Sequence, residues 1–81
     1  MDRFVIRGDR TMINEVLFME ARLFGEFLHK FDIRPKDANR MFERFGIWEY
    51  IEECYDVLHM NGDEYILNDI ESILKRRGAF A

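Results

Sequence analysis

Apolar residues recur at steps of three and four along the first third of the chain, at Leu17, Ala21, Phe24, Leu28 and Phe31. That spacing is typical of one face of an amphipathic helix, and Phe18 and Phe27 widen the apolar stripe. With Thr11 as a candidate N-cap, the pattern predicts a helix over about residues 12–31. Gly25 lies inside this helix and weakens it, which favours close packing of another helix there.

The segment Asp32-Ile33-Arg34-Pro35 is expected to separate this helix from a second one. Proline disfavours a helical conformation at the preceding residue and suits the first position of a new helix. The second helix is then expected to end at Gly46. Its inner face is expected to consist of Ala38, Met41, Phe42 and Phe45.

A third helical stretch follows Gly46 and carries two contrasting faces. Its apolar face is Ile47, Ile51, Cys54, Tyr55 and Leu58. The spacing predicts a helix that breaks or tightens near Asp56, and acidic residues occupy the side that we expect to face solvent. These acidic residues are Glu49, Glu52, Glu53 and Asp56.

The last helix is expected over about residues 62–77, with Ile66, Ile70, Ile73 and Leu74 buried. Asn61 is the candidate N-cap and Glu64 completes a capping box, while Met60 and Tyr65 have the spacing of a hydrophobic staple. Acidic residues begin this helix and Lys75, Arg76 and Arg77 end it, as the helix dipole favours. Gly78 is placed to close it in a left-handed conformation.

These patterns predict an all-α protein, a compact bundle of about four helices joined by short turns. With 81 residues, the chain has room for one domain. We expect an N-terminal arm at residues 1–10, where Phe4-Val5-Ile6 forms a short strand or lies against the body, or the terminus frays. The helical domain is expected at residues 11–78, followed by a tail at 79–81.

The charge is distributed unevenly along the chain, whose net charge is −4. Residues 1–45 contain nine basic and eight acidic side chains, residues 46–74 contain eight acidic and no basic ones, and the last residues add three basic ones. The acidic third disfavours duplex DNA, because neutralisation of phosphates dominates such binding, and it would attract a basic protein. A solvated face that keeps the protein in solution is the simpler interpretation.

Aromatic residues on the third helical stretch are the best candidates for anchoring a protein partner. Tyrosine and tryptophan dominate interface energetics. Because Tyr55 and Tyr65 are expected to pack around the turn between the last two helices, Trp48 and Tyr50 are the exposed anchors that we expect. The predicted partner-binding set therefore contains Trp48, Glu49, Tyr50, Glu52, Glu53 and Asp56.

The sequence gives no support for an enzyme, a cofactor or a metal site. His29, His59 and Cys54 match no zinc-ligand spacing, and neither a nucleophile motif nor a phosphate-binding glycine loop is present. Cys54 lies on the apolar face and has no partner for an internal disulfide, which favours a reducing cytoplasm. No segment approaches the roughly 20 apolar residues of a membrane span, and the N-terminus does not resemble a signal peptide.

Two alternatives to a partner-binding module stay open. Lys36, Arg40 and Arg44 recur every four residues on one outer stripe of the second helix, and this basic face suits a nucleic-acid-binding regulator. The helix that follows would then be the recognition helix, and it would place the negative charges of Glu49, Glu52 and Glu53 toward the DNA groove, where positive charge is needed. Self-association through exposed aromatic side chains is the other alternative.

Three segments together resemble a known family. They are Phe42-x-x-Phe45-Gly46-Ile47-x-x-Tyr50-Ile51, then Tyr55-Asp56-Val57-Leu58-His59, then Gly62-x-Glu64-Tyr65-Ile66-x-x-Asp69-Ile70. They resemble a bacterial family of short proteins classed only as a domain of unknown function. The resemblance covers about residues 13–77, although the first helix matches only in its apolar period.

The resemblance implies a small helical cytosolic protein with no established activity. It also implies that the gene lies beside a gene for an ADP-ribosyltransferase-like protein of the toxin kind. That neighbourhood implies a partner of this class and an antitoxin, immunity or adaptor role. The acidic third of the chain is compatible with binding a basic partner of this kind.

Overall fold

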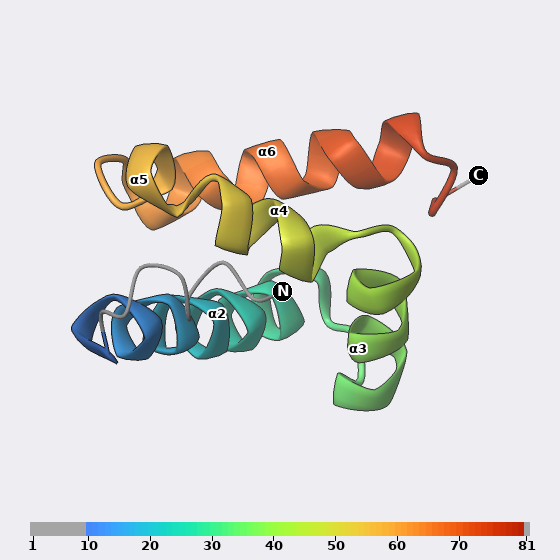
Figure 1. Ribbon diagram of the computed structural model, residues 1–81. Coiled ribbons are helices and arrows are strands. Elements are labelled where there is room, and N and C mark those ends of the chain that lie inside the picture. The colour runs from blue at the N-terminus through green and yellow to red at the C-terminus, as the bar shows by residue number, and fades with distance from the viewer. Residues whose placement is uncertain (1–9, 81) are drawn as a thin grey trace.

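The computed structural model describes the backbone of residues 10–80 and the side chains of residues 14–80 (Figure 1). The described part is all α-helical and contains no strand, as the sequence predicts. Its helices are α2 (Arg10–Phe31), α3 (Pro35–Arg44), α4 (Ile47–Glu53), α5 (Tyr55–Leu58) and α6 (Asp63–Arg76). The expected arm at residues 1–10 falls almost entirely outside the described residues, and so does Ala81.

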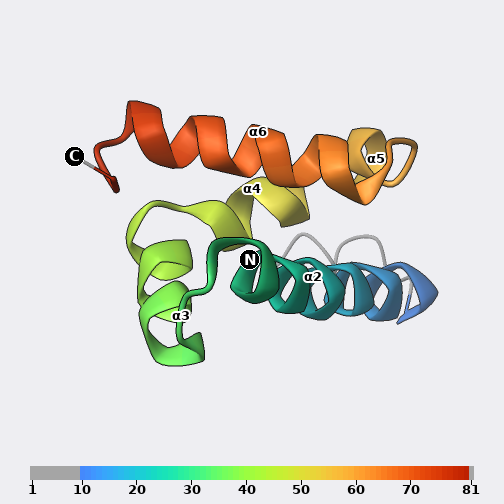
Figure 2. The ribbon, with the colours of Figure 1, turned by 180° about the vertical axis from the view of Figure 1, so that it is seen from behind.

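Helices α2 and α6 run in the same direction along the length of the molecule, and α4 lies between them (Figures 1 and 2). The chain returns from the end of α2 to the start of α6 through α3, α4 and α5. Helix α3 lies beyond the C-terminal end of α2, whereas α5 and the start of α6 lie at the end where α2 begins (Figure 1). The molecule measures 39 × 26 × 21 Å.

The core lies where α2, α3, α4 and α6 meet. Its fully buried side chains include Leu23, Phe27, Phe42, Ile47, Ile51, Ile66, Ile70 and Leu74. Phe42 contacts Phe27 edge to face at 4.9 Å and Trp48 at 4.8 Å between ring centroids. Such aromatic pairs contribute beyond the apolar area that they bury, so they help to stabilise a domain with few core residues.

Helix α2 buries only part of the expected stripe, because Phe24, Leu28 and Phe31 pack against the core while its other members do not. The buried residues are Val16, Met19, Leu23 and Phe27. In contrast, 57% of Leu17 and 69% of Phe18 is exposed, and Ala21 is also exposed. Apolar residues occur on both sides of α2, so periodicity alone does not locate the centre of the buried stripe, which is shifted toward Met19 and Leu23. The expected close packing on Gly25 is also absent, because no heavy atom lies within 4 Å of a Cβ placed there.

The turn before α6 corrects a second expectation. The N-cap is Gly62, which makes no side-chain cap hydrogen bond. The Asn61 side chain instead donates from Nδ2 to the Val57 carbonyl at 3.0 Å. Met60 and Tyr65 are both exposed and do not form the expected staple. The turn is therefore held by its own backbone bonds, such as the 2.9 Å bond from the Asn61 amide to the Leu58 carbonyl.

The other helix boundaries follow the sequence closely. Pro35 begins α3. Gly46 separates α3 from α4 and has a φ of 71°. Gly78 closes α6 with a φ of 86°, and the Ala79 amide donates to the Leu74 carbonyl at 2.8 Å. This is a Schellman motif. The third helical stretch breaks near Asp56 as predicted, at Cys54.

Candidate protein-interaction surface

The outward side of α4 and α5 carries the acidic residues that the sequence singled out. Glu49, Glu53 and Asp56 are exposed, and they are followed by Val57 and Met60, which are 64% and 80% exposed. Cys54 joins the two helices, since its amide donates to the Tyr50 carbonyl at 3.0 Å and its carbonyl accepts from the Leu58 amide at 2.8 Å. Both helices therefore present one surface, which we call the α4–α5 surface and define by these five residues.

Glu52 departs from the expected outward orientation. It is half-buried and lies against Glu20 of α2, which is only 7% exposed. Burial raises the pKa of Glu20 to about 7, and the charge of Glu52, its hydrogen bond to Glu20 and the charge of Glu49 add to the effect. A proton shared between Glu20 and Glu52 thus limits the repulsion between the two carboxyl groups. The other two acidic residues of α4, Glu49 and Glu53, are exposed as predicted.

Trp48 and Tyr50 are not the exposed anchors that the sequence suggested. Trp48 is half-buried and packs on the rings of Phe24 and Phe42, at 5.4 and 4.8 Å between centroids. Tyr50 is also half-buried, and its hydroxyl donates a hydrogen bond to Asp69. Burial and the Asp69 carboxylate raise the pKa of Tyr50. Both rings therefore pack against the core instead of projecting into solvent.

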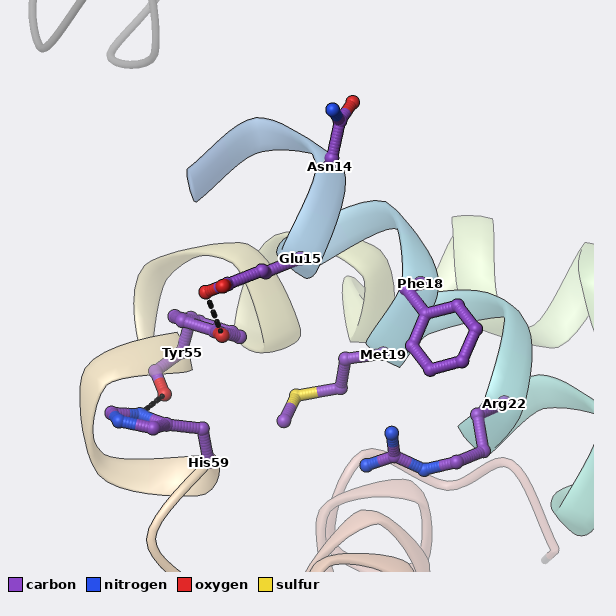
Figure 3. Close-up of a pocket in the computed structure, with 7 residues that line it drawn as sticks. All are labelled: Asn14, Glu15, Phe18, Met19, Arg22, Tyr55 and His59. Atoms are coloured by element: carbon purple, nitrogen blue, oxygen red, sulfur yellow. Dashed lines mark hydrogen bonds between the residues drawn. The ribbon is translucent and has the colours of Figure 1, made fainter. Parts of the chain in front are cut away.

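Beside α5, a groove separates this helix from the first turns of α2 (Figure 3). It is lined by Asn14, Glu15, Phe18, Met19, Arg22, Tyr55 and His59. The Tyr55 hydroxyl donates to Glu15 Oε1 at 2.9 Å and its ring stacks on His59, with centroids 4.9 Å apart. His59 Nδ1 lies 2.9 Å from the Tyr55 carbonyl. A carbonyl only accepts, so Nδ1 carries the hydrogen, and Nε2 is the ring nitrogen that remains for a ligand.

An ion pair between α2 and α6 borders the same groove. Arg22 Nε and Nη2 donate to the two oxygens of Asp63 at 2.9 and 3.0 Å. The Arg22 guanidinium lowers the pKa of Asp63. Burial raises the pKa of the neighbouring Glu26, and its hydrogen bond with Asp63 adds to the shift. No pattern in the sequence reveals this contact, because residues 22 and 63 lie 41 positions apart.

The basic face of the second helix exists as predicted. Lys36, Arg40 and Arg44 are all exposed on α3. The Arg77 guanidinium donates to the carbonyl of Phe45 just after α3, so the basic C-terminal end of α6 lies close to this face. Positive charge therefore gathers around α3 and the start of α4, where Arg77 and Glu49 both lie close to Gly46, whereas α5 lies at the other end of the molecule (Figure 1).

Within residues 14–80, no group of three His, Cys, Asp or Glu side chains has the geometry to hold a metal ion. Cys54 is half-buried and packs against the core, and its thiol forms no disulfide. No helix in the described part of the chain is long and apolar enough to span a membrane.

Comparison with known proteins places the chain in one family. Searches of curated protein sequences and of solved structures find no match. A family model described as "Protein of unknown function (DUF3791)" matches residues 17–77, which is most of the chain and contains every helix from α3 to α6. The chain belongs to the DUF3791 family of proteins of unknown function.

Proposed function

We propose that this chain is a non-enzymatic protein-binding module of the cytoplasm, and that a basic partner docks on the α4–α5 surface. The observation that carries the proposal is the composition of this surface, where three exposed carboxylates adjoin two exposed apolar side chains. Apolar contacts supply affinity at an interface, while charges steer the approach of a partner and select its sign.

We further propose that the partner is an ADP-ribosyltransferase-like toxin encoded beside this chain, and that binding neutralises it. Two features support this class of partner. The first is the family resemblance, which implies such a gene neighbourhood. The second is the run of residues 46–74, whose eight acidic and no basic side chains suit a basic surface on the partner.

Co-expression with the product of the adjacent gene tests the proposal. We expect the two proteins to purify together, and we expect cells that produce both to grow where cells that produce the neighbour alone do not. The double variant Asp56→Lys with Met60→Ser should weaken the complex by at least about tenfold, since it removes one charge contact and one apolar contact. Arg40→Glu on α3 is the matched control and should leave the complex intact.

Salt dependence provides a second measurement. Steering by the acidic surface predicts that the association rate constant falls as ionic strength rises, with a smaller change in the dissociation rate constant. Failure of the two proteins to purify together, or a complex that the double variant leaves unchanged, would refute the assignment of the α4–α5 surface.

The exposed basic face of α3 favours one alternative, a nucleic-acid-binding regulator that uses Lys36, Arg40 and Arg44. Phosphate contacts by these side chains predict binding of duplex DNA that weakens steeply with salt. Fluorescence anisotropy at low salt measures it, with Arg40→Glu as the variant that should abolish the signal. A flat titration eliminates this alternative.

A further inference from the structure

Helix α2 has an uncharged outward face opposite its buried stripe. Asn14, Leu17, Phe18, Ala21 and Gly25 are all exposed, and none carries a charge. At 100° per residue, Phe18, Ala21 and Gly25 lie on the side of the helix away from Val16, Leu23 and Phe27. A surface helix normally places charged and polar residues there. This face is therefore suited to contact with another protein surface.

The face combines a projecting side chain with a hollow. Phe18 is the projecting side chain, and its ring stands on the Arg22 side of α2 while Met19 reaches toward α5 (Figure 3). The hollow lies over Gly25, where a Cβ would meet no heavy atom within 4 Å. Its other lining residues are Ala21, His29 and Leu67 and the charged Arg22, Glu26, Lys30, Asp63 and Glu64. Phe18 and Gly25 are seven residues apart, so they share a face and are separated by roughly 10 Å.

We propose that two copies of this chain pair through this face of α2 in an antiparallel arrangement. A two-fold axis near Ala21 and Arg22 places Phe18 of each copy over Gly25 of the other. The projecting side chain and its hollow belong to the same helix, so one symmetry operation fills both hollows, as in an isologous interface. The small side chain of Ala21 lets the two helices approach closely at the axis.

The charges beside this face are complementary under the same symmetry. Glu15 lies near the start of the face, and His29 and Lys30 lie near its end. An antiparallel arrangement sets Glu15 of each copy beside His29 of the other, whereas Lys30 lies toward α6, where its Nζ donates to Asn68 Oδ1 at 3.0 Å. The two Arg22 side chains meet near the axis, but Asp63 of the same copy already neutralises each of them.

The same charges favour a second copy over the basic partner proposed above. The α4–α5 surface is acidic and attracts a basic protein, whereas the hollow of the α2 face has basic and acidic lining residues, with Arg22 paired to Asp63, and gives a basic partner less electrostatic advantage. The two surfaces lie on different helices, so the dimer and the partner complex are independent proposals.

Sedimentation velocity of the full chain tests the dimer. A contact of two helices is smaller than a standard interface, so we expect a dissociation constant on the order of 10–100 μM. Phe18→Ser should weaken the dimer by roughly a hundredfold, because each copy loses the burial of one ring. Met60→Ser removes a similarly exposed apolar side chain from the α4–α5 surface and should leave the dimer unchanged.

Gly25→Ala provides a variant that does not threaten folding. An added methyl group should stabilise the helix of the monomer and yet weaken the dimer, because it occupies the hollow. A variant that raises the stability of the monomer while lowering the affinity of the dimer is expected only if Gly25 lies in the proposed contact. A dimer that tolerates both Phe18→Ser and Gly25→Ala would overturn the proposal.

Disulfide crosslinking locates the axis. In a Cys54→Ser background, Ala21→Cys should oxidise readily to a covalent dimer, because the two Ala21 positions approach each other across the axis. Ser72→Cys on α6 is the exposed control and should crosslink only slowly. If the full chain remains monomeric at about 500 μM, or the two cysteine variants crosslink equally, the α2 face is covered by another segment or binds another protein, and the proposal fails.

Discussion

Arg22 of α2 and Asp63 of α6 form a two-pronged ion pair, with both donor–acceptor distances at or below 3.0 Å. The pair fixes the first turn of α6 against the middle of α2. Glu26 lies beside the pair, and the charge of Arg22 opposes the rise in the Glu26 pKa that burial and Asp63 cause.

Replacing Arg22 by methionine should lower the free energy of unfolding by about 1 kcal/mol. The apolar stem is retained, but Asp63 and Glu26 then face each other without a cation. The effect stays modest because the side chains of the pair are 38% and 31% exposed and water screens their charges. Urea denaturation measures it. Lys75→Met removes the more exposed pair with Glu71 and is expected to cost less than about 0.5 kcal/mol.

The buried Glu20 should make stability fall as the pH rises. Its pKa is about 7 in the folded chain and near 4.5 when unfolded. The carboxyl group is protonated in both states below pH 4.5, so it carries no penalty there. Between pH 4.5 and 7 the unfolded state loses this proton first, and the folded state is destabilised by an amount that approaches about 3 kcal/mol above pH 7.

Glu20→Gln should remove most of this pH dependence and raise stability at pH 8, where thermal or urea unfolding of both proteins is compared. The amide still donates a hydrogen bond to Glu52 but cannot ionise. Glu64→Gln on the exposed side of α6 is the control and should keep the slope of the parent chain. A Glu20→Gln variant with an unchanged slope between pH 5 and 8 would contradict the shared proton.

Gly46 should not tolerate a side chain. Its φ of 71° is in the left-handed region, and an added Cβ would lie 3.1 Å from Arg77 Nη1. We expect Gly46→Ala to destabilise the chain by about 1–2 kcal/mol, chiefly through backbone strain. Chemical denaturation together with the Arg77→Ala background separates the two causes: if the penalty vanishes in that background, the contact rather than the strain is responsible.

Gly62 should accept a side chain with a gain in stability. It is the N-cap of α6 with a φ of −73°, and an added Cβ would meet no atom within 4 Å. Serine there can accept a hydrogen bond from a free amide of the first turn and also restricts the unfolded chain. We expect Gly62→Ser to add about 0.5–1 kcal/mol, seen as a higher midpoint in thermal unfolding. A lower midpoint would show that this cap requires glycine.

Trp48→Ala should lower the free energy of unfolding, and any loss of partner binding should follow from that destabilisation. The ring packs between Phe24 and Phe42, so its loss should cost about 2–4 kcal/mol. Circular dichroism and urea denaturation measure this cost directly. For that reason a binding defect in Trp48→Ala would not identify Trp48 as a contact residue, and a variant such as Met60→Ser is the appropriate probe. Unaltered stability in Trp48→Ala would contradict the packing described above.

The helices and their boundaries could be predicted from the sequence because local chemistry determines them. Pro35 fixes its own φ, and Gly46 and Gly78 permit the positive φ at which a helix readily ends. The N-cap of α6 was misassigned for a related reason. Asn61 is a good capping residue, but its side chain also bonds backward to the Val57 carbonyl, and local sequence does not reveal which bond forms.

The candidate surface could be predicted only in part. The exposure of Glu49, Glu53 and Asp56 follows from helical spacing, as the structure confirms. Which aromatic side chains enter the core depends on helix crossings that one sequence does not encode locally, so Trp48 and Tyr50 were misplaced. The pairs Glu20–Glu52 and Arg22–Asp63 join residues far apart in sequence, and nothing short of the fold reveals them.

The common direction of α2 and α6 has a consequence for the electric field around the molecule. Two helix dipoles that point the same way reinforce each other, with their positive poles at the end where α5 lies. Asp63 and Glu64 at the start of α6, and Lys75 and Arg76 at its end, oppose this backbone field. Because these positive poles lie at the α5 end, they partly offset the carboxylate of Asp56, and the acidic side chains at the start of α6 counter that effect.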